Sequence, residues 1–225
     1  IIGQDAKSTN GFVKKIKPKP EQLVAMSDFL KDEFLKNHQI EPKFVVTNGI
    51  NPTLFEPLNT ELRPIDILGA GSLIPLKNYC LFIEVIAEVV KQFPNLNAKI
   101  AGDGEERKLL SDLIIQHKLQ KNVELLGAKK HNETLGLMNQ SKLFLHTSHY
   151  EGNSTVLMEA LYSGCQVIST QQLSFAELKN LYTNTSKTEL VKSVITLLNQ
   201  NRPFERITFN TMENSAQQMV QLLLR

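Results

Sequence analysis

The chain has 225 residues, of which 41% are hydrophobic and 21% are charged, and its net charge at neutral pH is +2. This composition is ordinary for a globular protein, and the small net charge gives no support for a dedicated nucleic-acid binder. No apolar run approaches the roughly 18 residues that a membrane-spanning helix needs, and no signal peptide is visible. We therefore expect a cytoplasmic protein whose two cysteines, Cys80 and Cys165, are reduced core residues.

The part of the chain before residue 60 predicts few regular elements. Residues 1–7 resemble the end of a strand whose own sheet lies outside the chain. The basic run 14–20 is broken by two prolines and predicts a loop, which is either a solvated turn or a membrane-surface patch. The pattern that follows predicts a strand, a helix capped by Ser27 and a second strand, at 23–26, 28–36 and 44–46.

From residue 64 the chain alternates between short apolar runs and amphipathic stretches of helical period. Strands are predicted at 65–68, 98–101, 123–126, 143–147 and 167–168. Helices are predicted at 78–91, 105–117, 132–140, 154–163, 173–181, 187–200 and 204–224. This alternation predicts an α/β fold with a doubly wound parallel sheet, Rossmann-like in its architecture. Ligands of such sheets bind beyond the carboxyl ends of the strands.

The turn after the strand 143–147 has the most specific chemistry in the chain. It holds an acidic residue, a glycine and three candidate helix caps: Glu151, Gly152, Asn153, Ser154 and Thr155. The first amides of the next helix carry partial positive charge, which suits a phosphate or sugar hydroxyl groups. Glu159 follows among apolar residues, where a carboxylate needs solvent or a partner such as the two hydroxyl groups of a ribose. On the spacing alone, a solvated surface glutamate is an equally good interpretation.

Glu151, seven further residues and Glu159, followed by Ala160 and the run S-G-C-Q-V-I at 163–168, resemble a known signature. It is the E-x7-E signature of retaining GT-B glycosyltransferases of family 4. In that family the first glutamate contacts the donor sugar, and the second binds the ribose of a nucleotide-sugar. The resemblance covers about residues 22–200 and implies these roles for Glu151 and Glu159, with the 151–155 turn holding the sugar and the adjacent phosphate.

The resemblance also implies donor-binding roles for residues that follow other strands. An arginine and a lysine hold the donor diphosphate in the family; Lys77 fits the lysine, although a solvated lysine remains the alternative. Ser72 departs from the arginine and supplies no charge, so either another cation compensates or turnover is weaker. The glycine turn Gly102 and Gly104 matches a turn near the nucleoside. The loop whose backbone would read the base consists of Ala128, Lys129 and Lys130.

The domain organisation follows from the same resemblance. The turn N-G-I-N at 48–51 and the F-E-P at 55–57 match the family's linker into its second domain. We therefore expect residues 1–40 to be the tail of a mostly missing N-terminal GT-B domain with its linker. Residues 41–202 would be the nucleotide-sugar-binding domain, and residues 203–225 a C-terminal helix that crosses back to the N-terminal domain.

The implied reaction is transfer of a sugar from a UDP- or GDP-sugar to a hydroxyl group of a carbohydrate or lipid-linked acceptor, with retention, in polysaccharide or glycolipid synthesis. Glu151 and Lys77 would be the catalytic residues, without a metal or cofactor. The chain by itself is expected to bind nucleotide weakly and to be inactive. The enzyme would work in the cytoplasm or at the inner face of the membrane, with peripheral membrane contact through its N-terminal domain.

Three alternatives stay open. A sugar-nucleotide epimerase or hydrolase of the same fold would share the donor site, and a non-catalytic nucleotide-binding module would explain the loss at Ser72. The pair Gly69 and Gly71 suggests a dinucleotide cofactor, but Ile74 occupies the place of the third glycine of that fingerprint. His146 is placed on a strand and His149 in the active turn, where His149 either contacts the donor or is a structural or solvated residue.

Overall fold

We describe the fold from a computed structural model of the chain, which describes residues 1–171 and 178–224. Its centre is a six-stranded sheet in the order β5-β4-β3-β6-β7-β8, with every neighbouring pair parallel. The strands are β3 (Ile65–Ala70), β4 (Ala98–Ala101), β5 (Val123–Gly127), β6 (Ser141–His146), β7 (Gln166–Ser169) and β8 (Leu181–Thr183). The predicted α/β fold with a parallel sheet is therefore confirmed.

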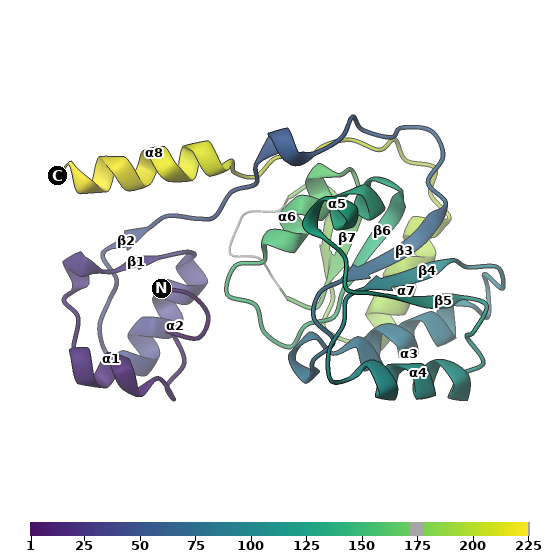
Figure 1. Cartoon of the computed structure of the whole chain (residues 1–225), viewed down its shortest axis with the longest axis horizontal. Helices are drawn as coiled ribbons and strands as arrows, with labels where there is room; N and C mark the ends of the chain where they lie inside the picture. The colour runs from purple at the N-terminus through teal and green to yellow at the C-terminus, as the bar shows by residue number, and fades with distance from the viewer. Residues whose placement is uncertain (172–177, 225) are drawn as a thin grey trace.

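Helices cover both faces of this sheet (Figure 1). One face packs against α3 (Tyr79–Val89), α4 (Arg107–Gln116) and α7 (Lys187–Leu198). The other face packs against α5 (His131–Asn139) and α6 (Thr155–Tyr162). The strand order reverses between β3 and β6, since the chain first builds outward through β4 and β5 and then returns to the other side of β3. Such a reversal is where doubly wound sheets bind their ligands.

The first 46 residues form a separate small unit, which we call the N-terminal lobe. It contains α1 (Gly11–Ile16), β1 (Val24–Ala25), α2 (Asp28–His38) and β2 (Phe44–Val45), and the two short strands pair in parallel. Its core is built on Ala6, Ala25, Leu30 and Phe34. Ser27 caps α2 as predicted, because its side chain accepts a hydrogen bond from the Leu30 amide.

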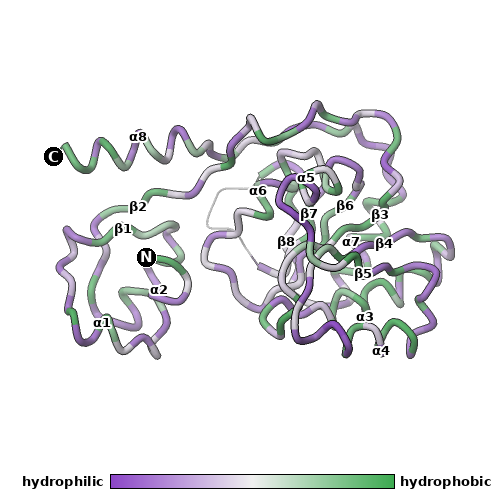
Figure 2. The backbone as a smooth tube through the Cα atoms, viewed as in Figure 1, coloured by the Kyte–Doolittle hydropathy of each residue, from purple (hydrophilic) through white to green (hydrophobic). Residues whose placement is uncertain are grey.

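The last helix, α8 (Met212–Leu223), lies beside the N-terminal lobe rather than against the large sheet (Figure 1). The extended segment that leaves the N-terminal lobe runs beside the extended segment that leads into α8 (Figure 1), and the two are joined by a parallel bridge between Ile50 and Thr211. Ser215 Oγ donates to Thr47 O at 2.7 Å and so anchors the first turn of α8. Apolar and polar residues alternate around the helix in Figure 2, and none of its residues is buried.

Several predicted elements differ from the structure. Residues 1–7 form turns instead of a strand, with the Asp5 amide bonded to Ile2 O. The start of the basic run 14–20 belongs to α1, because Asn10 caps that helix and both prolines come only after it ends.

The C-terminal region also departs from the prediction. Residues 204–210 are not helical, since this extended stretch leads into the bridge at Thr211, which then caps α8. The predicted helix 173–181 lies largely outside the described residues, and its last residue, Leu181, begins strand β8.

Candidate active site

The predicted donor-site residues all follow strands β3, β4, β5 and β6, so they share one edge of the sheet. Lys77 ends a short 3-10 helix after β3 (Pro75–Lys77), and Glu151 lies in the loop after β6. Since β3 and β6 are neighbours on either side of the reversal in strand order, these two loops meet. Thr147 Oγ1 donates to Lys77 O at 3.1 Å, and the His149 amide donates to Leu76 O at 2.9 Å, which ties the loops together.

The centre of the edge is an ion pair between Lys77 and Glu151. Lys77 Nζ donates to Glu151 Oε1 at 2.5 Å, with 23% and 16% of the two side chains exposed. The two residues are 74 positions apart in the sequence, and only the parallel pairing of β3 with β6 brings them together. Because both are partly shielded from water, this pair is stronger than an ordinary surface salt bridge.

Two further donors complete this cluster, and the sequence prediction missed both. Ser148 Oγ donates to Glu151 Oε1 at 2.9 Å, and His146 Nε2 lies 3.1 Å from the same oxygen. The sequence predicts no more for His146 than a place on a strand, although its position five residues before an acidic signature residue is a signal of a role near Glu151. In the structure it is buried at the end of β6.

These contacts decide the ionisation of Glu151. Burial by itself raises the pKa of this carboxyl, but hydrogen bonds from His146 and Lys77, together with the charge of Lys77, outweigh burial and lower the pKa to about 2. The neighbouring phenol of Tyr79 shows the opposite effect, since burial and then the Glu151 charge raise its pKa. Glu151 is therefore a carboxylate at neutral pH and cannot act as a general acid there.

The lowered pKa of Glu151 predicts an acid-dependent loss of stability. A carboxyl whose pKa is lower in the folded state stabilises the fold above its ordinary pKa of about 4.5, and this contribution disappears as the pH falls towards 2. We expect Glu151 to account for on the order of 2 kcal/mol of the decrease, after allowance for solvent screening. Denaturant unfolding at a series of pH values between 2 and 5 measures this decrease as a change in the free energy of unfolding.

The comparison that isolates this contribution is with the variant Glu151→Gln, which should lose much less stability over the same pH window. Glu88 is a suitable control, because it pairs with Lys91 at the exposed end of α3 and also has a lowered pKa, caused first by the Lys91 hydrogen bond. Glu88→Gln should keep most of the acid slope. An equal slope in the wild type and in Glu151→Gln would show that Glu151 is not held as described.

The N-terminus of α6 lies directly beyond Glu151. Ser154 is the cap residue by position, but its side chain makes no capping hydrogen bond. The residue is only 3% exposed, and Ser154 Oγ has no hydrogen-bond partner among the described residues. An unpaired buried hydroxyl beside the free amides of a helix start is a ready donor for an anionic oxygen.

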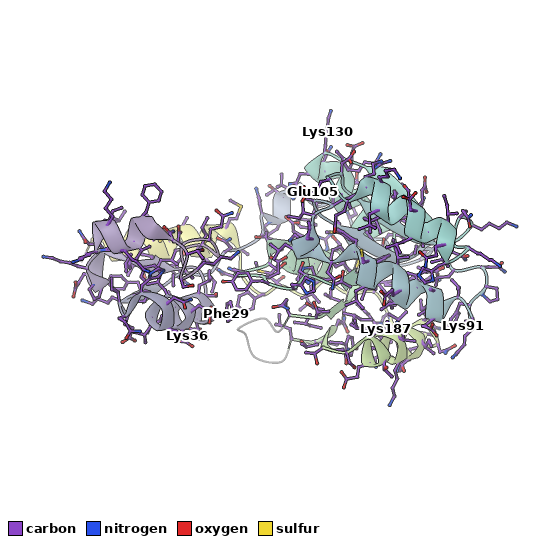
Figure 3. The ribbon with its side chains drawn as sticks, turned by 90° about the horizontal axis from the view of Figure 1, so that it is seen from below. Phe29, Lys36, Lys91, Glu105, Lys130 and Lys187 are labelled. Carbon is purple, nitrogen blue, oxygen red and sulfur yellow. The ribbon has the colours of Figure 1, made fainter. Side chains whose placement is uncertain are left out.

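The N-terminal lobe holds the remaining part of this loop. Ser27 Oγ donates to Gly152 O at 2.8 Å, and Asn153 Nδ2 donates to Met26 O at 3.0 Å. Phe29 lies on the side of the lobe that faces the large sheet (Figure 3), and its ring packs against that of Tyr150 at 5.6 Å between centroids. The predicted cap candidate Asn153 therefore anchors the loop to the lobe instead of capping α6.

Glu159, the second glutamate of the signature, is on α6 and has a partner that the sequence prediction missed. His131 Nε2 lies 2.8 Å from Glu159 Oε1, and the side chains are 56% and 14% exposed. His131 is the first residue of α5, so the packing of α5 beside α6 makes the pair. Glu159 is thus a mostly buried carboxylate paired with His131, and its binding to a ribose stays a prediction.

The glycine turns pack the loops of neighbouring strands closely together. A Cβ atom on Gly102 would lie 1.8 Å from Gly71 O, a distance that excludes every other residue. The Gly102 amide donates to Gly127 O at 2.9 Å and joins the ends of β4 and β5. Gly104 belongs to the same turn, where the Leu73 amide donates to the carbonyl of Asp103.

The other predicted donor-site residues are exposed at this edge, namely Ser72, Ala128, Lys129 and Lys130. Lys130 points outward from the body of the molecule (Figure 3). None of them joins the cluster around Lys77 and Glu151 through a hydrogen bond or ion pair among the described residues. Among residues 1–171 and 178–224, no group of three or more acidic, histidine or cysteine side chains could hold a metal ion.

Residues 51–216 match the family of glycosyl transferases group 1. A phosphatidylinositol N-acetylglucosaminyltransferase subunit of Arabidopsis thaliana is 28% identical over 157 residues, which is 67% of this chain and 35% of that protein. The human protein of the same name is 29% identical over 152 residues, 66% of this chain and 31% of its own length. The chain thus spans about a third of the curated relatives it matches.

Solved structures give the same fold at lower sequence identity. The pneumococcal O-GlcNAc transferase GtfA, in complex with UDP and GlcNAc, has a TM-score of 0.70 at 21% identity, covering 89% of this chain and 44% of that one. Anabaena HepE, in complex with UDP and glucose, has a TM-score of 0.70 at 20% identity and covers 89% and 62%. No helix in the described ranges is both long and apolar enough to cross a membrane. The chain belongs to the glycosyl transferases group 1 family, and its parallel sheet corresponds to the Rossmann-like C-terminal half of GT-B glycosyltransferases.

Proposed function

We propose that this chain is the donor-binding part of a retaining glycosyltransferase that takes its sugar from a UDP-sugar. The observation that carries the proposal is the Lys77–Glu151 pair, which lies at the reversal of strand order beside the open N-terminus of α6. The cation and the free helix amides suit the diphosphate of the ligand, and the carboxylate suits the hydroxyl groups of its sugar. The acceptor that the whole protein uses and the product that it forms are likewise proposals.

The diphosphate would lie between Lys77 and the start of α6. The side chain of Lys77 is 23% exposed, and its ammonium group would bind a phosphate oxygen. Ser154 Oγ and the first amides of α6 would donate to the adjacent phosphate, which supplies the missing partner of that buried hydroxyl. These groups neutralise the charge that develops on the leaving nucleoside diphosphate, and each such donor is typically worth about 3 kcal/mol.

Glu151 would accept hydrogen bonds from the hydroxyl groups of the donor sugar. Its carboxylate is ionised at neutral pH, so it is suited to accept protons in hydrogen bonds and to stabilise positive charge at the sugar as the leaving group departs. Lys77 contacts this carboxylate and would also contact the phosphate. It therefore couples the sugar-binding group to the leaving-group site.

Glu159 would bind the ribose. Its carboxylate is 14% exposed and now accepts from the exposed His131 ring, a partner that a ligand can displace or share. Bidentate contact with two neighbouring hydroxyl groups compensates a carboxylate for the loss of that bond. Backbone groups at Gly102, Gly104 and 128–130 would then contact the nucleoside, in agreement with their place at the ends of β4 and β5.

UDP is proposed as the nucleotide because the pneumococcal GtfA and Anabaena HepE structures, which share this fold, are complexes with UDP. Residues 1–40 are proposed to belong to the N-terminal GT-B domain, and 203–225 to the helix that crosses back to it. The acceptor, a carbohydrate or lipid-linked hydroxyl compound, would bind mainly to that domain. This chain alone is therefore expected to bind nucleotide weakly and to transfer no sugar.

Calorimetric titration of UDP into the chain tests the donor site directly. We expect Lys77→Ala and Glu159→Gln each to weaken the UDP affinity about tenfold, because each removes one charge-assisted contact worth roughly 1.5 kcal/mol. Lys91→Ala is the matched control, since Lys91 forms a similarly short pair with Glu88 on the exposed end of α3. Unchanged affinity in both site variants would contradict the proposed location.

The same titration with GDP in place of UDP tests the choice of base. A donor assay on the full-length protein without acceptor separates the related enzyme classes, since a hydrolase releases free sugar and an epimerase releases an epimerised one. UDP binding combined with no donor turnover by the full-length protein under any acceptor condition would favour the non-catalytic module.

A further inference from the structure

His146 has no role in the donor binding proposed above, yet both of its ring nitrogens lie within hydrogen-bonding distance of side chains. It is the last residue of β6, 5% exposed, and pairs across the sheet with Ser169 of β7. His146 Nδ1 lies 3.0 Å from Ser169 Oγ, and Nε2 lies 3.1 Å from Glu151 Oε1. An imidazole held at both ends has a single orientation, and it fixes whatever group it contacts.

The hydroxyl groups around the ring decide where its protons lie. Ser169 Oγ accepts the Gln171 amide at 3.0 Å and has one proton of its own, which can go to Gln171 O at 2.9 Å or to His146 Nδ1 at 3.0 Å. Ser148 Oγ lies 2.9 Å from both Nε2 and Glu151 Oε1 but has only one proton to give. In the tautomer in which Ser148 donates to the carboxylate and Ser169 donates to Nδ1, the neutral ring carries its single proton on Nε2 and donates it to Glu151 Oε1.

Every contact of this cluster falls on the same oxygen of Glu151. Lys77, Ser148 and His146 all bond to Oε1, and no hydrogen bond to Oε2 occurs within the described ranges. Glu151 Oε1 thus anchors the carboxylate, while Oε2 is available to a ligand. The His146 ring is also tied to the neighbouring strand β7, through Ser169.

We propose that His146 is a positioning residue for sugar transfer, which holds Oε1 of Glu151 so that Oε2 is presented to the donor sugar. This inference rests on the proposed function, because it gives Glu151 the sugar-binding role. His146 would touch neither the diphosphate nor the ribose. Its removal should therefore lower kcat while leaving nucleotide affinity unchanged, whereas a purely structural role would change both or neither.

The test compares His146→Leu with His146→Gln in the full-length protein. The readouts are UDP release from UDP-GlcNAc and UDP-glucose, and the Kd for UDP. The leucine fills the buried space without a donor, and we expect kcat to fall about 30-fold, since misplacing a reacting group by about 1 Å can cost roughly 100-fold. The glutamine amide can replace the Nε2–H and should restore kcat to within about fivefold of wild type. The UDP Kd should stay within about threefold in both variants.

Two further variants test the anchor of the His146 ring and control for effects of replacing any histidine. Ser169→Ala keeps the imidazole but removes its anchor, and we expect an approximately fivefold lower kcat with an unchanged UDP Kd. His117→Gln is the control, because His117 is exposed at the end of α4, away from this edge. Thermal melting of each variant reports its folding.

The outcomes separate the two levels of the proposal. A wild-type protein that neither binds UDP nor releases it would overturn the donor assignment itself. With an active wild type, three results would overturn the role of His146: full activity in His146→Leu, equal damage in His146→Gln and His146→Leu, or full activity in Ser169→Ala. A loss of kcat in His146→Leu that His146→Gln restores, at constant UDP affinity, would establish it.

Discussion

Glu151→Gln should reduce sugar transfer by the full-length protein about 100- to 1,000-fold, the range typical for losing one charged or oriented group that stabilises a transition state. Glutamine keeps the size of the side chain but removes its negative charge. Lys77, Ser148 and His146 then share a neutral amide oxygen in place of the charged acceptor at Oε1, and the second carboxylate oxygen is replaced by an NH2 donor. The sugar loses both an oriented acceptor and the carboxylate opposite the developing positive charge.

The same variant should bind UDP as well as the wild type or better, because Lys77 is no longer paired with a carboxylate and is free for the diphosphate. Steady-state transfer rates and the UDP Kd are therefore measured together. Glu88→Gln, which alters the exposed pair with Lys91, should change neither quantity. If UDP binding and transfer fall in parallel in Glu151→Gln, the glutamate supports the nucleotide site rather than the sugar site.

Arg63→Ala should lower the free energy of unfolding by about 4 kcal/mol, since it leaves several buried carbonyl groups without a donor and opens a cavity. Arg63 is 1% exposed, and its guanidinium group bonds to backbone oxygens of four residues at distances of 2.7 to 3.4 Å. These carbonyls belong to Asn59, Met138, Ser141 and Ser163. The guanidinium also lies over the Phe204 ring, 4.0 Å from its centroid.

Arg63 therefore joins the segment before β3 to the ends of α5 and α6 and to the C-terminal region. Arg63→Lys should recover only part of the loss, because one ammonium cannot reproduce the planar fork of donors. Arg202→Ala is the control: Arg202 is exposed, bonds to the Tyr182 hydroxyl, and should change stability by no more than about 0.5 kcal/mol. Denaturant unfolding measures all three, and a loss below about 1 kcal/mol in Arg63→Ala would contradict this account.

Most of the sheet could be predicted from local sequence. The strand at 98–101 matches β4, and the helices at 78–91 and 187–200 match α3 and α7 to within a few residues. Apolar periodicity and breaker residues act over a few positions, so they locate buried elements well. They failed at 204–210, where an extended segment follows a neighbouring chain segment through a tertiary bridge.

The candidate site was predictable to a smaller extent. Glu151, Glu159 and Lys77 were proposed from their resemblance to a family signature, and the parallel order of the strands places their loops on one edge. His131 and His146 were missed as partners, because their roles depend on how helices pack and on which way a turn folds back. No spacing rule contains that information.

By itself the sequence determined an alternating α/β chain with a parallel sheet, an acidic helix-start motif and a lysine after an earlier strand. The tertiary structure was needed to show that Lys77 and Glu151 form one ion pair, that His146 contacts the same Glu151 oxygen, and that Arg63 is buried among carbonyl groups. The physical reason is that local patterns reflect backbone propensity and burial, whereas pairing between distant polar groups depends on strand order and on the exclusion of water where loops meet.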